Sequence, residues 1–105
     1  MAGTEYPDSA EQLRQRQQQD LKPPDLYRVL LHNDHYTTME FVVEVLIKVF
    51  RKSVIDATEI MLNVHEKGFG QAGQYTFDIA RTKVTLVHRM AKQREFPLKC
   101  TIEKV

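Results

Sequence analysis

The densest group of side chains that could do chemistry lies in the polar run at positions 32–37, with a further histidine at position 65. Asn33, Asp34 and His35 follow a predicted strand and precede a predicted helix. Asn and Asp bond readily to their own backbone in turns, so ordinary loop structure is one explanation. A functional interpretation needs a partner site. His65 supplies one, because it follows Met61 by four residues and shares its helix face.

A metal site built from these groups would use His32, His35 and His65, with Asp34 as the fourth ligand. The spacing His32-x-x-His35 at a strand end lacks the paired spacings of a closed zinc site. No second thiol or cluster of carboxylates supports it. We therefore expect no metal and no other cofactor.

A hydrolase would use Asp34 to orient His65 against a nucleophile, which makes a small peptidase or amidase the alternative function. The single cysteine, Cys100, lies in an alternating apolar pattern typical of a core strand. No glycine-rich elbow accompanies any Ser or Thr. The pattern favours a binding protein over an enzyme, and both remain open on the residues alone.

Composition narrows the class of protein. The chain has 105 residues, 42% hydrophobic and 28% charged, which is typical of one globular domain. Its net charge of +1 gives no broad positive field for nucleic acid. No apolar run is long enough for a membrane span or an export signal, and one cysteine requires no oxidising compartment. We expect a cytoplasmic protein that binds neither nucleic acid nor membrane.

The composition changes near residue 24. Residues 1–24 hold only six apolar side chains and end in two prolines, which favour an extended backbone. We expect a flexible N-terminal extension over residues 1–24 and a folded domain over residues 25–105. Within the domain, periodicity predicts strands at 26–31, 69–75 and 98–102, and helices at 39–50, 53–67 and 76–96.

These elements predict an α+β domain of order β-α-α-β-α-β, with three helices packed on a small, mostly antiparallel three-stranded sheet. The stretch at 69–75 is rich in Gly and Gln, so it indicates an edge strand or a broad loop. Thr37 with Glu40, and Ser53 with Asp56, fit helix N-terminal capping boxes. Gly68 fits the end of the second helix.

Several stretches together resemble the ClpS family: residues 30–42, residues 61–65 with Gly68, residues 82–84 and residues 97–101. The resemblance covers positions 23–105 without interruption. It implies a fold similar to the C-terminal domain of the ribosomal stalk protein. It also implies a non-catalytic adaptor that captures proteins with N-terminal Leu, Phe, Tyr or Trp and delivers them to the ClpA N-terminal domain of the ClpAP protease.

The resemblance also implies roles for single residues. Asn33, Asp34, His35 and His65 would bind the substrate α-amino group. The pocket for the first side chain would be formed by residues of both helices and the last strand: Thr37, Met39, Val42, Met61, Val64 and Leu98. Asp78 and Lys83 would dock on the unfoldase. His35 stands where the family usually has a second acid, and Thr38 where it usually has proline.

Overall fold

The computed structural model describes residues 22–105, and the observed order of elements confirms the predicted β-α-α-β-α-β fold. Residues 22–26 form neither helix nor strand and lead directly into the first strand. Most of the predicted N-terminal extension, residues 1–21, lies outside the described residues. The elements are β1 (Tyr27–His32), α2 (Met39–Lys48), α3 (Val54–Lys67), β2 (Phe69–Tyr75), α4 (Phe77–Gln93) and β3 (Lys99–Lys104).

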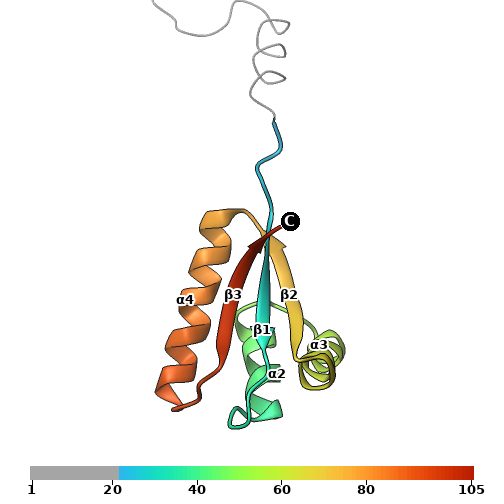
Figure 1. The fold of residues 1–105 in the computed structure, drawn as a ribbon, viewed down its shortest axis with the longest axis vertical. Helices are drawn as coiled ribbons and strands as arrows, with labels where there is room; N and C mark the ends of the chain where they lie inside the picture. Colours follow the sequence, from blue (N-terminus) through green and yellow to red (C-terminus); the bar gives the residue numbers. More distant parts are fainter. Residues whose placement is uncertain (1–21) are drawn as a thin grey trace, which may run out of the picture.

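The three strands form one antiparallel sheet with β1 in the centre, in the order β2-β1-β3. The stretch at 69–75 is therefore an edge strand. In the register, Leu31 of β1 stands between Gly70 of β2 and Cys100 of β3. All three helices lie on one face of the sheet: α2 passes behind β1 in Figure 1, α4 lies along β3, and α3 lies beside β2.

The core lies between this face of the sheet and the helices. Val29 and Leu31 alternate along β1 and are fully buried, as the period of two in a strand requires. They meet the apolar stripe of α2, in which Phe41, Val45 and Leu46 are almost completely buried. The predicted amphipathic helix therefore packs as expected, with Glu44 and Lys48 forming an exposed ion pair on its outer side.

The helix termini show one difference from the sequence prediction. The N-cap of α2 is Thr38, whose hydroxyl accepts a hydrogen bond from the Phe41 amide at 3.1 Å. The prediction of Thr37 was wrong because the Thr37 hydroxyl donates instead to Asp34. Capping of α3 by Ser53 is confirmed by a 3.1 Å bond from the Asp56 amide.

Two glycines shape the junction of α3 and β2: Gly68 lies between the two elements, and Gly70 is the second residue of β2. Gly68 ends α3 with φ of 92°, a left-handed conformation that glycine adopts without steric cost. Gly70 allows β2 to approach α3 closely, because a Cβ there would lie 2.8 Å from a methyl group of Val64. The end of α3 is thereby held against the end of the sheet where β1 finishes.

Candidate functional site

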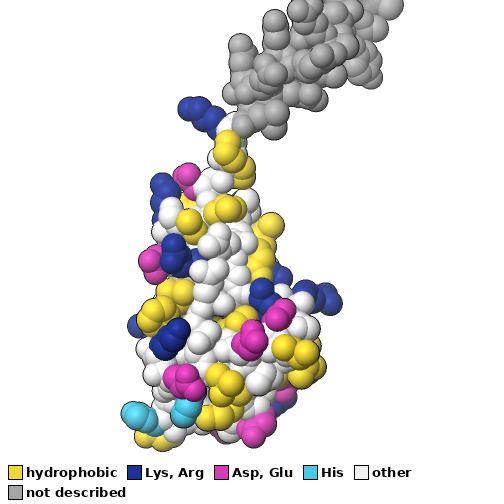
Figure 2. All heavy atoms as spheres, turned by 90° about the vertical axis from the view of Figure 1, so that its right-hand side faces the viewer, with side chains coloured by type: hydrophobic (Ala, Val, Ile, Leu, Met, Phe, Trp, Pro, Cys, Tyr) yellow, Lys and Arg dark blue, Asp and Glu magenta, His cyan; other side chains and the backbone are white. Residues whose placement is uncertain are grey.

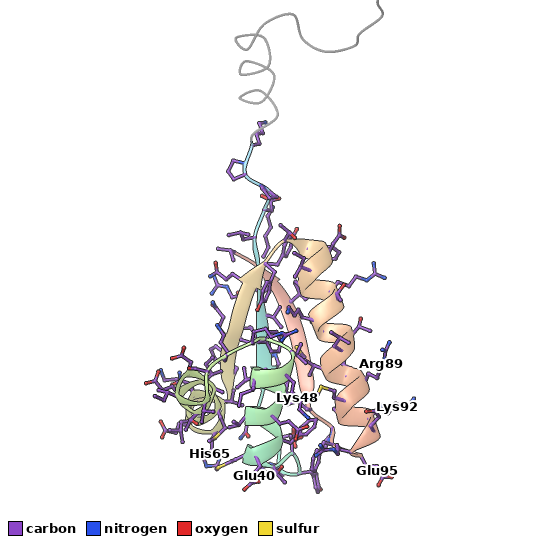
Figure 3. The ribbon with its side chains drawn as sticks, turned by 180° about the vertical axis from the view of Figure 1, so that it is seen from behind. Glu40, Lys48, His65, Arg89, Lys92 and Glu95 are labelled. Atoms are coloured by element: carbon purple, nitrogen blue, oxygen red, sulfur yellow. The ribbon has the colours of Figure 1, made fainter. Side chains whose placement is uncertain are left out.

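A cavity of about 270 Å³ opens where the end of β1, the start of α2 and the end of α3 meet. Every residue that lines it was among the candidates predicted from the sequence. These residues are Asn33, Asp34, His35, Thr37, Met39, Val42, Met61 and His65. Figure 2 shows histidine side chains beside hydrophobic ones at this end of the molecule, and Figure 3 shows His65 of α3 at the same end as Glu40 of α2.

A backbone hydrogen bond explains why the polar loop and the end of α3 come together. The Asn33 amide donates to the Gly68 carbonyl at 2.9 Å, across 35 positions of the chain. The Gly68 amide in turn donates to the Val64 carbonyl at 3.0 Å and closes the last turn of α3. His65 lies in this last turn. The loop residues and His65 are therefore fixed to one another through the backbone.

The Asp34 carboxylate is occupied by its own loop. One oxygen accepts hydrogen bonds from the backbone amides of Tyr36 at 2.8 Å and Thr37 at 2.7 Å. The other accepts from the Thr37 hydroxyl at 2.7 Å. Partial burial opposes the charge, but the hydrogen bonds from Thr37 and Tyr36 and the positive charge of His35 outweigh it, so the pKa of Asp34 is lowered. Asp34 shapes the loop and leaves a negative charge at the cavity.

The other end of the cavity is apolar. Val42 is 6% exposed and belongs to the core, so this part of the wall is rigid. Met39 is 42% exposed and Met61 is partly buried, so the two methionines form the part of the wall nearer the solvent. The cavity therefore has acceptor groups at one end and hydrocarbon and thioether groups at the other.

Two predicted pocket residues do not line this cavity. Val64 is 2% exposed and packs in the core behind the end of α3. Leu98 is 4% exposed and lines a different, wide hollow together with Tyr36, Phe96 and residues of α4. Both were assigned by resemblance, and periodicity alone could not tell a lining side chain from one in the layer beneath it.

Comparison with known proteins identifies the family. Residues 22–101 match the family model of the ATP-dependent Clp protease adaptor protein ClpS. The chain belongs to the ClpS family. It is 57% identical over 86 residues to the ClpS of Nitratidesulfovibrio vulgaris, which covers 82% of this chain and 86% of that protein. It is 60% identical over 84 residues to the ClpS of Acetivibrio thermocellus, covering 80% and 85%.

A solved ClpS structure supports the same assignment. Agrobacterium tumefaciens ClpS2 bound to L-phenylalaninamide superposes with a TM-score of 0.75 at 39% identity, covering 78% of this chain and 99% of that one. The protein is thus an adaptor of the Clp protease and not an enzyme. Within the described residues, no helix is both long enough and apolar enough to cross a membrane.

Two of the residues considered for the alternative chemistries, His32 and Cys100, lie away from the cavity. The His32 ring lies 2.7 Å from the Thr101 hydroxyl, on the sheet and away from the cavity lining. Residues 22–105 contain no group of three or more His, Cys, Asp or Glu that could hold a metal ion. Burial raises the pKa of the Cys100 thiol to about 12, so it remains protonated near neutrality and cannot act as a nucleophile.

The two predicted docking residues lie on α4, in different surroundings. Asp78 is exposed in the first turn. Lys83 is partly buried: its Nζ donates to the Val49 carbonyl at 2.7 Å and lies 5.4 Å from the centre of the Tyr75 ring. Because Val49 is the C-cap of α2, the Lys83 ammonium also stabilises the end of that helix.

Replacing Asp34 by Asn should lower the melting temperature at pH 7 by a few degrees. In Asn an NH2 group takes the place of Oδ2, and this group cannot accept the hydrogen bond that the Thr37 hydroxyl donates. Since the folded state lowers the pKa of Asp34 below its ordinary value of 3.8, this stabilisation is present above that pH and is lost as the pH falls through the folded-state pKa. Thermal melts of wild type and Asp34→Asn between pH 7 and pH 3 should therefore converge on acidification. A difference that is constant with pH would contradict this role of the carboxylate.

Proposed function

We propose that this ClpS family member binds the free amino terminus of proteins whose first residue is Leu, Phe, Tyr or Trp and delivers them to the ClpA unfoldase of the ClpAP protease. The observation that carries the proposal is the two-sided cavity, which has acceptors at one end and apolar side chains at the other. The ligand of the Agrobacterium relative carries two groups that would match this lining, a free amine and an aromatic side chain.

The polar end suits an ammonium group. Burying a charged amine is costly unless oriented acceptors replace water. The Asn33 side chain offers a carbonyl oxygen and neutral His65 a ring nitrogen, and both line the cavity. The C-terminal end of α3 adds a partial negative charge. In our proposal Asp34 contributes its charge while it holds the loop, and His35 lies at the rim where it can touch the same group.

The apolar end suits one large side chain. Thr37, Met39, Val42 and Met61 line it. Burying a Leu or Phe side chain there contributes roughly 1.5–3 kcal/mol. Val64, which lies in the core outside the lining, would support the pocket from the layer behind, whereas Leu98 lines a different hollow.

Delivery requires a second surface and a second segment. We propose that the ClpA N-terminal domain docks at Asp78 and Lys83 of α4, since Asp78 is exposed and Lys83 keeps part of its surface in solvent. We also propose that residues 1–24 act as an extension separate from the binding domain at 25–105.

An adaptor for an ATP-dependent protease must work where ATP is present, so we place it in the cytoplasm.

The direct test is titration of the full chain into a fluorescent peptide that begins with Phe, followed by anisotropy. We expect saturable binding, and mass spectrometry should show an intact peptide after prolonged incubation. The matched control is the same peptide with Asp in the first position, which should not bind because its charged side chain would be buried without a partner. Absence of binding to Phe, Leu, Tyr and Trp peptides alike would refute the proposed function.

A further inference from the structure

A second hollow lies against the wall of the proposed first-residue pocket. It has a volume of about 380 Å³ and lies between α2 and α3, lined by Met39, Glu40, Val43 and Met61. Met39 and Met61 also line the pocket of about 270 Å³. These two side chains therefore border both the pocket and the hollow, while Val43 and Glu40 line only the hollow.

The wall made by Met39 and Met61 differs from the rest of the pocket in what lies behind it. Val42 is backed by the close-packed core and has nowhere to move. Met39 and Met61 also border the unfilled space of the hollow. Methionine is unbranched and flexible, so it can change rotamer at little cost where space is available. This wall can yield toward the hollow when a large group enters the pocket.

Resting on the proposed function, we propose that the hollow is a relief space for the pocket and that Val43 determines how large a first residue the pocket accepts. A Leu side chain needs little displacement of the wall, whereas the indole of Trp needs the most. Val43 does not line the pocket, so it acts as a positioning residue through Met39 and Met61. Glu40 lies at the rim of the hollow, at the exposed start of α2 (Figure 3).

The test is to fill the hollow from behind. Val43→Phe should place a ring against the far side of the methionine wall and hinder its movement. We expect the affinity for a Trp-initiated peptide to fall about tenfold relative to wild type, while the affinity for a Leu-initiated peptide changes by less than about threefold. The readout is the ratio of the two affinities, which a general loss of stability would not shift selectively.

Two further variants separate filling from other effects. Glu40→Gln changes the charge of the same hollow with almost no change in volume, so it should leave the Trp-to-Leu ratio unchanged. In the double variant Val43→Phe with Met39→Ala, the side chain whose movement the new ring blocks is itself shortened. The affinity for the Trp peptide should therefore recover toward that of Met39→Ala alone. Should Val43→Phe fail to fold, Val43→Leu is the smaller filling variant and should shift the ratio in the same direction.

The proposal is overturned if the filling variant leaves the Trp-to-Leu ratio unchanged, or if Met39→Ala does not relieve its effect. These outcomes differ from failure of the proposed function, in which wild type itself binds neither peptide. An equal loss of both affinities would also overturn the relief space, since it would show that Val43 only supports the fold.

Discussion

Acetylation of the α-amino group of a Phe-initiated peptide is expected to abolish measurable binding. In the proposed binding mode, the acetyl group removes the positive charge and two of the three N–H donors, so neither Asn33 nor His65 keeps a hydrogen bond to a charged group. Each hydrogen bond to a charged group contributes roughly 1.5–3 kcal/mol, about a tenfold or greater change in affinity. Loss of two such bonds predicts a weakening of about a hundredfold or more. Competition anisotropy with free and acetylated peptides measures it directly.

Two single variants locate this effect in the cavity. Asn33→Ala and His65→Ala should each weaken the free-amine peptide about tenfold or more. Neither should change the residual affinity of the acetylated peptide, because the bonds removed are the ones that acetylation has already broken. Amidation of the carboxyl end of the peptide is the matched chemical control and should have no effect. Comparable affinities for free and acetylated peptides would show that the amine is not the recognised group.

The sequence pointed to the residues of the cavity in two ways: the polar loop and His65 stood out by their residue types, whereas Thr37, Met39, Val42 and Met61 were named through the resemblance to the ClpS family. The polar residues at 32–37 mark the end of the first strand, and Gly68 marks the end of α3. What it could not show is the bond from the Asn33 amide to the Gly68 carbonyl that joins them. A backbone bond carries no signature in side-chain types, so the meeting of the two segments had to come from the fold or from a resemblance.

The errors have similar physical origins. Thr37 and Thr38 are both good N-cap residues, and the choice was decided by Asp34, which takes the Thr37 hydroxyl. Long-range contacts were also invisible, such as the ion pair at 2.9 Å between Arg94 and Glu44, 50 positions apart. In each case the outcome depends on which of several suitable partners the tertiary structure brings within reach.

The second large effect is expected at Met39. Its side chain lies at the edge of the pocket, 42% exposed, and lines the space next to the start of α2. Ile and Val branch at Cβ, so their extra methyl group is held close to the peptide backbone and near the pocket mouth, whereas Leu branches one carbon further in. Met39→Ala should therefore improve the affinity for Ile- and Val-initiated peptides by about tenfold, or about 1.4 kcal/mol, with little loss for Leu.

The matched control for Met39 is Met39→Leu, which keeps the volume of the wall and should keep the exclusion of Ile and Val. Met39→Ala also shows whether Met39 controls which side chains enter the pocket or only fills the core. Truncation of a fully buried methionine costs about 2–5 kcal/mol of stability, and the exposure of Met39 predicts a smaller loss. In Met39→Ala the Ile-to-Leu affinity ratio should thus rise strongly while the melting temperature falls only slightly. A ratio that stays at the wild-type value would show that another residue selects against branched side chains.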